Sequence, residues 1–225
     1  MNEFMPKARI FGTARRWGMT LVELLVVIAV VALLAALTGP ALKQAKALAV
    51  RMGCINNQRQ LFFAARMFAD ENDGSLPARA MVATDERWPA AFQAYLNGNT
   101  GVYRCPSAKD DAEMQQDPFS NAHNNTSYII NGFNDVMTYN TPSAMKVDRL
   151  SDPSGIILFG ESKNGDGGFY MDLDEGNEQT ALDTARHSGG ACYVFADGHA
   201  GWIRSPQTVT EKLWWVNKSY VPPSL

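Results

Sequence analysis

Residues 15–38 have the sequence RRWGMTLVELLVVIAVVALLAALT, and this stretch decides how the chain is organised. The run from Leu21 to Thr38 is 18 residues long, nearly all apolar and rich in Val, Leu and Ala. A helix that rises about 1.5 Å per residue reaches roughly 27 Å over this run, close to the ~30 Å hydrocarbon core of a bilayer. The sequence therefore predicts one membrane-spanning helix near the N-terminus.

Charge is distributed unevenly around this span. Residues 1–18 contain one acidic residue, Glu3, and four basic residues: Lys7, Arg9, Arg15 and Arg16. Subtracting them from the totals of 20 basic and 23 acidic residues leaves 16 and 22, so the remainder carries −6. A cationic flank favours a cytoplasmic leader with the rest of the chain exported. The net charge of −3 gives no reason to expect a nucleic-acid partner.

Glu23 does not suit an ordinary span. It lies only two residues into the apolar run, with no basic residue within a helical turn on its C-terminal side. An ionised carboxylate at membrane depth is costly, so it either has a partner or lies at headgroup level. A secretory signal peptide, cut near Ala36-x-Thr38, is a competing interpretation. Glu23 inside the apolar segment and the helical pattern beyond Pro40 count against it.

The string around Gly18 resembles the processing site of type IV prepilins and pseudopilins. In that family a membrane peptidase cuts after the glycine and the new N-terminus is methylated. The resemblance implies cleavage between Gly18 and Met19 and methylation of Met19, although the family prefers Phe at the second position. It also implies that Glu23 pairs with the amine of a neighbouring subunit, because opposite charges attract strongly in an apolar medium.

Residues 41–70 have the composition of a helical stalk that continues the span. Pro40 would usually end a helix, but pilin helices carry a proline bend at this distance from the cut. One face of the stalk shows 4-3-4-3 spacing and is expected to pack on the domain: Cys54, Gln58, Leu61, Ala65 and Phe68. Phe63 and Met67 point the other way, toward a filament neighbour or a second buried face. The turn-forming residues 70–74 predict the helix end.

Residues 74–225 predict a globular domain built on an antiparallel sheet. Apolar runs predict a short helix at 88–96 and strands at 127–132 and 155–160. Asp197-Gly198, between two further apolar runs, predicts a hairpin with a two-residue type I′ turn. That turn would place these side chains on one face: Tyr193, Phe195, Ala200 and Trp202. It would place these on the other face: Cys192, Val194, Ala196, His199 and Ile203.

A second resemblance lies in this C-terminal half. His187 precedes Asp197-Gly198 with the H-x9-DG spacing of a prepilin-like family, and residues 54–61, CINNQRQL, resemble its stalk. The resemblance implies structural roles for His187, Asp197 and Gly198, with His187 expected to hydrogen-bond backbone near the hairpin. It also implies a structural hydrogen bond for Glu161, at the end of a predicted strand.

The three cysteines are Cys54, Cys105 and Cys192, and no two form a C-x-x-C pair, which argues against a zinc ribbon or a thioredoxin-type site. Cys54 and Cys105 match family positions, and the resemblance implies a disulfide between them in an oxidising compartment. Cys192 is expected to be a small core residue.

Two sets of residues have side chains that could bind an ion, and we prefer a structural interpretation for both. His187, Asp197 and His199 resemble a metal triad, but the predicted turn gives the last two a structural use. An acidic loop offers oxygen ligands for calcium, yet it lacks the D-x-D-x-D-G order of an EF-hand. Its residues are 164–168, Asp172, Asp174, Glu175 and Glu178. We therefore expect no resident metal or cofactor.

The combined prediction is an α+β, pilin-like fold with a leader at 1–18, a span and stalk at 19–73, and a globular domain at 74–225. No G-x-S-x-G, H-E-x-x-H or P-loop motif occurs, so we expect a structural protein and no enzyme.

The predicted function is that of a subunit in a type IV pilus-like or type II secretion pseudopilus filament. Its expected partners are copies of itself or related pilins, the prepilin peptidase, the assembly machinery and the inner membrane. The domain would lie outside the cytoplasm, with the filament in the periplasm or at the cell surface. Two alternatives remain open: a secreted or membrane-anchored ligand-binding protein, and a membrane-anchored enzyme that uses His187 and Asp197.

Overall fold

The computed structural model describes residues 18–77, 87–108, 126–131, 146–150, 152–163, 170–171 and 182–205. These residues form a long N-terminal helix and a sheet dominated by antiparallel pairing, so the predicted α+β class is confirmed. The described residues divide into two compact units, with the boundary between Gln44 and Ala45. All but the first four residues of the predicted stalk, 41–70, therefore belong to the globular unit.

Helix α1, Leu21–Glu71, joins the predicted span and stalk in one continuous helix. It continues through Pro40, although proline supplies no backbone N–H to the helical ladder. The helix ends where the turn residues predict. Asp73 and Gly74 have φ of 53° and 77°, and the Gly74 N–H donates to the Ala69 carbonyl at 2.8 Å. This left-handed C-terminal turn satisfies a carbonyl that the helix leaves open.

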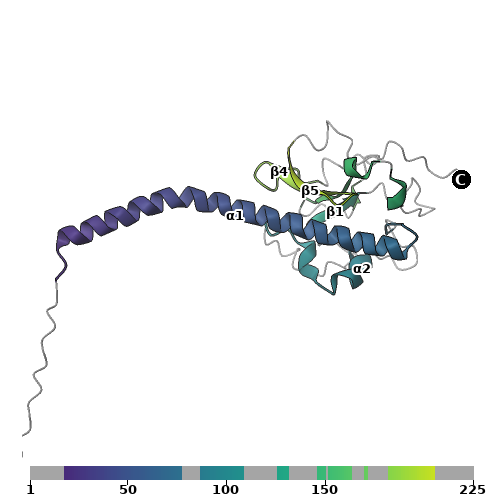
Figure 1. The fold of residues 1–225 in the computed structure, drawn as a ribbon, viewed down its shortest axis with the longest axis horizontal. Helices are drawn as coiled ribbons and strands as arrows, with labels where there is room; N and C mark the ends of the chain where they lie inside the picture. Colours follow the sequence, from purple (N-terminus) through teal and green to yellow (C-terminus); the bar gives the residue numbers. More distant parts are fainter. Residues whose placement is uncertain are drawn as a thin grey trace, which may run out of the picture. The chain divides into compact units, whose positions relative to one another are not determined.

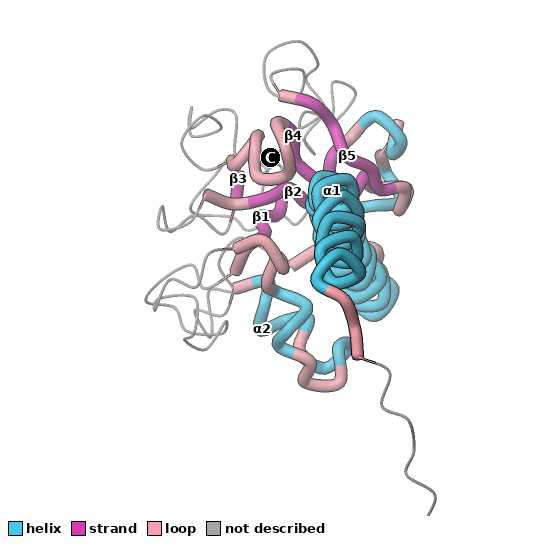
Figure 2. The backbone as a smooth tube through the Cα atoms, turned by 90° about the vertical axis from the view of Figure 1, so that its left-hand side faces the viewer, coloured by secondary structure: helices cyan, strands magenta, loops and turns pink. Residues whose placement is uncertain are grey.

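The sheet has five strands in the order β3-β1-β2-β4-β5. Their bounds are β1 Tyr128–Asn131, β2 Ile157–Glu161, β3 Tyr170–Met171, β4 Gly190–Phe195 and β5 Ala200–Arg204. Four strands pair antiparallel, and the two-residue β3 adds a parallel edge beside β1. Within the globular unit the strands lie together on one side of α1 (Figures 1 and 2).

Short helices complete the globular unit. Helix α2 covers Trp88–Phe92, and 3-10 helices cover Ala94–Leu96, Thr100–Tyr103, Val147–Arg149 and Pro153–Gly155. The ring of Trp88 packs against Phe92 and Phe159 at centroid distances of 5.7 and 5.4 Å. These aromatic contacts join α2 to the central strand β2, on the same side as α1.

Two apolar clusters cover the two faces of the sheet. The larger includes the predicted stalk face, and Cys54, Leu61 and Ala65 are each fully buried in it. The smaller lies on the other face and contains Ile129, Ile157, Leu182, Ala191, Tyr193 and Phe195. The stalk face that the spacing predicts is therefore the face that packs on the domain.

A β-bulge in β2 decides which of its side chains meet α1. Ile157 pairs with Phe195 and Phe159 pairs with Val194, so β2 has one residue more than β4 across this interval. Ile157 belongs to the smaller cluster, on the sheet face away from α1. Leu158 and Phe159 both belong to the larger cluster, on the face toward α1. Because side chains alternate along a strand, Glu161 then also faces α1.

The C-terminal hairpin forms, but its predicted turn and face assignment are wrong by one residue. The Phe195 N–H bonds the His199 carbonyl and the Gly198 N–H bonds the Phe195 carbonyl, which makes a three-residue loop. Only Gly198 has positive φ there, at 90°, while a type I′ turn needs two such residues. The strands pair Cys192 with Trp202 and Val194 with Ala200.

The one-residue shift in the register of β5 against β4 changes which side chains share a face of the sheet. Ala200 and Trp202 lie with Cys192 and Val194 on the α1 side, and Ile203 lies with Tyr193 on the far side. A turn with two positive φ values does occur, at Ser188 (55°) and Gly189 (83°), at the other end of β4. The loop at Gly198 lies against α1. A Cβ built on Gly198 would be only 2.6 Å from the Phe62 ring.

The first prediction concerns this contact. Alanine at position 198 would hold a left-handed φ and bring its Cβ to 2.6 Å from the Phe62 ring. We expect Gly198→Ala to lower the unfolding free energy by about 1–3 kcal/mol, measured by urea denaturation in detergent. Gly201→Ala is the control, because no atom lies within 4 Å of its added Cβ. Equal stability of the two variants would contradict the close approach.

Candidate functional site

The N-terminal segment begins with the predicted processing residues. Gly18, Met19 and Thr20 are exposed and precede the first helical residue, Leu21. No atom lies within 4 Å of a Cβ built on Gly18. The Gly18–Met19 peptide bond therefore lies in exposed, non-helical backbone, the conformation that a peptidase needs to bind.

Glu23 has a local role that the sequence analysis missed. Its Oε2 accepts hydrogen bonds from the Thr20 backbone N–H at 2.7 Å and from the Thr20 hydroxyl at 2.8 Å. The Glu23 N–H in turn donates to the Thr20 hydroxyl at 3.3 Å. These are the reciprocal bonds of a capping box, in which Thr20 is the N-cap and Glu23 the third helical residue. The T-x-x-E spacing of residues 20–23 was the signal for it.

The first half of α1 presents its apolar side chains to the outside. Every Leu, Val and Ile from Leu21 to Leu37 is between 49% and 79% exposed. Burying one such side chain completely is worth about 1.5–3 kcal/mol, so a helix of this kind is stable only where something apolar covers it. By length and composition, α1 is long and apolar enough to cross a membrane.

The second half of α1 also has an uncovered apolar patch. Phe63 is 62% and Met67 is 50% exposed, while Phe62 and Ala64 beside Phe63 are buried in the core. The two exposed side chains are four residues apart and share one helix face. The outward direction that the spacing predicts for them is confirmed, and the filament contact stays a prediction.

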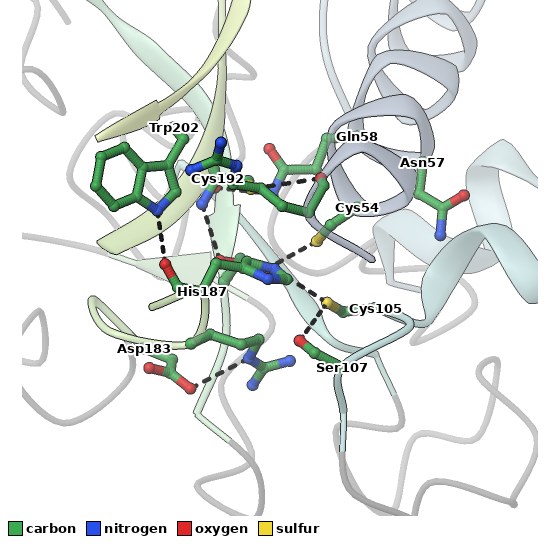
Figure 3. A network of polar contacts seen from close by, with 12 residues as sticks. Cys54, Asn57, Gln58, Cys105, Ser107, Asp183, His187, Cys192 and Trp202 are labelled. Carbon is green, nitrogen blue, oxygen red and sulfur yellow. Dashed lines mark hydrogen bonds and ion pairs between the residues drawn. The ribbon is translucent and has the colours of Figure 1, made fainter. Parts of the chain in front are cut away.

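A buried polar cluster joins α1 to the sheet and is the second candidate site (Figure 3). Its members come from separate segments: Cys54 from α1, Cys105 from the loop before Pro106, Glu161 from β2, His187 from the turn before β4, and Cys192 from β4. All five are buried, and the structure thus brings together four residues that the sequence singled out one at a time and a fifth expected only in the core.

Glu161 is the centre of this cluster. Its side chain is fully buried, and its Oε1 lies 2.8 Å from both Cys54 Sγ and His187 Nε2. Its Oε2 accepts from the Cys192 backbone N–H at 2.8 Å. The structural hydrogen bond expected for this glutamate is confirmed. It connects the helix, the sheet and the turn before β4.

Gln58 completes the connection from the helix. Its Nε2 donates to the Cys192 carbonyl at 2.8 Å, in a fully buried position. The backbone N–H and C=O of Cys192 are therefore both bonded by side chains, Glu161 and Gln58. Since buried backbone groups without partners are costly, these two side chains stabilise β4 beyond the point where its pairing with β2 ends at Val194.

The cysteines of the cluster are free thiols. The disulfide predicted between Cys54 and Cys105 is therefore not formed in this structure. Cys105 Sγ instead contacts the Ser107 hydroxyl at 3.1 Å and His187 Nε2 at 3.3 Å. Its loop is held on α1 because Asn57 Nδ2 donates to the Arg104 carbonyl at 2.8 Å. Cys192 is fully buried, as its expected core role requires.

The cluster perturbs the acid–base behaviour of its members. Burial raises the pKa of the Cys54 thiol far above its usual value, and contact with Cys54 together with burial raises the pKa of Cys105. Burial alone would lower the pKa of His187, but its contacts with Cys105 and Glu161 raise it to about 9. At neutral pH His187 is therefore protonated, and its Nε2 lies 2.8 Å from Glu161 Oε1 in the buried cluster.

His187 hydrogen-bonds backbone near the hairpin, as predicted, but through its own main chain. Its ring contacts Glu161 and Cys105, and it is the main chain of His187 that meets the hairpin. The His187 carbonyl accepts from Trp202 Nε1 at 2.8 Å, and its N–H donates to the Gly190 carbonyl at 2.8 Å. The bulge that turns Glu161 toward α1 creates the better partner for the ring.

Asp197 and His199 form a separate pair at the hairpin loop. Asp197 Oδ1 accepts from the His199 N–H at 3.0 Å and lies 2.6 Å from its ring Nδ1. The His199 ring stacks on Phe195 at a centroid distance of 4.0 Å. Among the described residues, the group with metal-ligand proximity that contains His187 includes neither of them. The calcium-loop residues, 164–168 and 172–178, lie outside the described residues.

Comparison of the chain with protein-family models, with curated proteins and with solved structures gives no match.

The second prediction concerns Glu161. Glu161→Ala leaves a buried imidazolium and the Cys192 N–H without their acceptor, and we expect a loss of about 3–5 kcal/mol of unfolding free energy. Glu71→Ala is the matched control, since Glu71 also accepts a hydrogen bond, from Tyr95 at 2.6 Å, but is exposed. Urea denaturation followed by near-ultraviolet circular dichroism measures both variants. A cost for Glu161→Ala no larger than that of the control would show that the cluster is not structural.

Proposed function

We propose that this protein is a structural subunit of a type IV pilus-like or type II secretion pseudopilus filament, processed after Gly18 and held in the inner membrane before assembly. The observation that carries the proposal is the first half of α1, whose apolar side chains are exposed along its whole length. Such a helix must be covered by lipid or by other helices. A filament subunit is covered by lipid before assembly and by the helices of its neighbours afterwards.

The arrangement of Thr20 and Glu23 supports a role for Glu23 at the contact between subunits. Both hydrogen bonds that Thr20 donates to the carboxylate end on Oε2. Oε1 then has a lone pair for the α-amino group that processing would create on Met19 of a neighbouring subunit. Because the charges of such a pair are strongly penalised when left alone in an apolar medium, subunits would assemble in the one register that pairs them.

The globular unit supports a structural role over a catalytic one. The residues with the most reactive chemistry, Cys54, Glu161 and His187, are between 0% and 5% exposed and bond one another. A substrate has no access to groups that are buried between a helix and a sheet. The exposed Phe63 and Met67 add an apolar patch on α1 that suits packing against a neighbouring subunit.

The proposed sequence of events has three stages. The prepilin peptidase cuts between Gly18 and Met19 at the cytoplasmic side, and the new amine is methylated. The chain waits as a single-pass inner-membrane protein with its domain outside the cytoplasm. The assembly machinery then extracts it, and α1 packs against α1 of copies or related pilins in the periplasm or at the cell surface.

The third prediction tests processing. We expect the mature wild-type chain to begin with an N-methylated Met19, as measured by mass spectrometry of the intact protein and its N-terminal peptide. Gly18→Val should keep its leader, because a branched side chain hinders access to the backbone at the scissile bond. Gly39→Val is the control, since its added Cβ also meets no atom within 4 Å, and it should be cut normally. A mature chain that starts near Gly39 or at Met1 would contradict the proposal.

The fourth prediction separates the two roles of Glu23. Glu23→Gln keeps a capping-box acceptor for Thr20 but removes the charge, so we expect filaments to disappear while the chain remains inserted and processed. Losing one member of a buried ion pair costs about 3–5 kcal/mol per contact. Thr20→Ala removes the capping hydroxyl and keeps the charge, so it should still assemble. Electron microscopy and shear fractionation of cells with the assembly machinery measure both variants.

If Glu23→Gln assembled as the wild type does, the charge would have no part in subunit register. If Thr20→Ala abolished filaments and Glu23→Gln did not, the residue would act only as a helix cap.

A further inference from the structure

The buried cluster contains a set of metal-ligand atoms that the proposed function does not use. The ligand atoms of Cys54, Glu161, His187 and Cys192 all lie within 4.8 Å of one another, and all four residues are buried. Two are thiol sulfurs, one is an imidazole nitrogen and one is a carboxylate oxygen. A fifth atom, Cys105 Sγ, lies 3.3 Å from His187 Nε2. Four separate segments of the chain supply the four inner atoms.

We propose that this cluster is a structural zinc site, with Cys54, Glu161, His187 and Cys192 as its four ligands. Zinc in structural sites takes four ligands in a tetrahedral arrangement, and thiolate, imidazole and carboxylate are the groups it prefers. Soft thiolates select zinc over the calcium or magnesium that all-oxygen sites hold. The site depends on no filament contact, and it stands or falls independently of the proposed function.

The spacing of the donor atoms suits such an ion. Zinc–sulfur bonds of about 2.3 Å and zinc–nitrogen or zinc–oxygen bonds of about 2.0–2.2 Å place tetrahedral ligands roughly 3.4–3.8 Å apart. Glu161 Oε1 lies 2.8 Å from Cys54 Sγ and 2.8 Å from His187 Nε2. Binding therefore requires these two contacts to lengthen by roughly half an ångström to one ångström.

The surroundings hold the ligands in place. The Cys192 backbone N–H bonds Glu161 Oε2 and fixes the carboxylate from behind. The main chain of His187 is bonded on both sides, by Trp202 Nε1 and by Gly190. Outer bonds of this kind orient metal ligands before the ion arrives. The ligands also lie between α1 and the sheet, so an ion there would join the two layers of the domain.

Binding changes the protonation of the cluster in a balanced way. The bound set would consist of two thiolates, one carboxylate and one neutral imidazole around the ion. Zinc displaces one proton from His187 and one from each of Cys54 and Cys192, because only the deprotonated forms are ligands. The three negative ligands and the two positive charges of the ion give the bound set one net negative charge. Arg186 forms an ion pair with Asp183 and also interacts electrostatically with Glu161.

The chemical alternative to zinc is oxidation. Cys54 Sγ contacts Glu161 Oε1, and Cys105 Sγ contacts the His187 nitrogen that bonds the same oxygen. Thiols in an exported domain also meet an oxidising environment. A zinc ion on Cys54 would hold its sulfur as a bound thiolate and prevent a disulfide. The two outcomes exclude each other for Cys54, so counting thiols distinguishes them.

The experiment uses the full chain, purified in detergent from cells grown with zinc. Elemental analysis by mass spectrometry should find zinc equimolar with the protein, and alkylation after denaturation with a chelator should find all three cysteines as thiols. Substituting cobalt for zinc should give the intense visible bands of a tetrahedral ion and near-ultraviolet thiolate-to-cobalt charge-transfer bands. A chelator should lower the urea midpoint, and added zinc should restore it.

Variants test the ligand assignment with cobalt alone as the probe. Cys54→Ser, Cys192→Ser and His187→Ala should each weaken cobalt binding by more than the roughly 10–100-fold that loss of an outer-sphere partner costs. Cys105→Ser and His199→Ala are the controls and should keep the cobalt spectrum. Near-ultraviolet circular dichroism identifies variants that fail to fold, and for those the wild-type chelator and zinc titrations remain decisive.

Two results would overturn the proposal. One is a wild-type chain without zinc that contains a Cys54–Cys105 disulfide and shows no change of urea midpoint with a chelator. The other is a cobalt spectrum that Cys105→Ser abolishes and Cys192→Ser leaves intact, which would reject the assignment of Cys192 as a ligand.

Discussion

The globular unit depends on one buried carboxylate. Glu161 accepts from the backbone of β4, from a thiol of α1 and from the imidazole before β4. A buried carboxylate is tolerated only when its lone pairs are occupied and its charge is matched, and His187 supplies that charge. The helix and the sheet are consequently held by a polar contact as well as by apolar packing. Such a contact is directional, so it selects one position of α1 on the sheet where apolar packing alone would accept several.

The two halves of α1 differ in how their apolar side chains are shielded from water. Beyond Cys54 the helix buries a regular stripe against the sheet, and the domain supplies its cover. From Leu21 to Leu37 the helix is apolar on all sides and exposed. A soluble helix would have a polar face there, so this half suits an apolar surrounding that the part of the chain described by the structure does not supply. The capping box at Thr20 and Glu23 makes the start of the helix independent of that surrounding.

Local patterns predicted much of this structure, and long-range contacts explain what they missed. The stalk stripe, the helix end at Gly74 and the strands of the hairpin follow from spacing and turn residues. The hairpin register was wrong because Asp-Gly fits both a two-residue turn and a three-residue loop, and only the φ of Asp197 separates them. The polar cluster was invisible because its members are far apart in sequence, and the direction of Glu161 depends on a bulge that leaves no mark in the local pattern.

The resemblance to prepilin-like chains supplied residues without their relation. It pointed to Cys54, Cys105 and His187 separately, and implied a disulfide where the structure has two thiols beside an imidazole. A sequence motif of this kind identifies important positions. Only the folded structure shows how the residues at those positions contact one another.

The spacing of nine residues between His187 and Asp197 acquires a geometric meaning from the way β4 lies on α1. At one end of the strand, His187 reaches the layer of Cys54 through Glu161, and at the other end Gly198 lies against Phe62. Cys54 and Phe62 are about 12 Å apart along the helix axis. The motif thus spaces two contacts of the sheet with α1 that lie about two helical turns apart on the helix. Inserting or deleting one residue within β4 would release one of its two ends, whatever the chemistry of the residue.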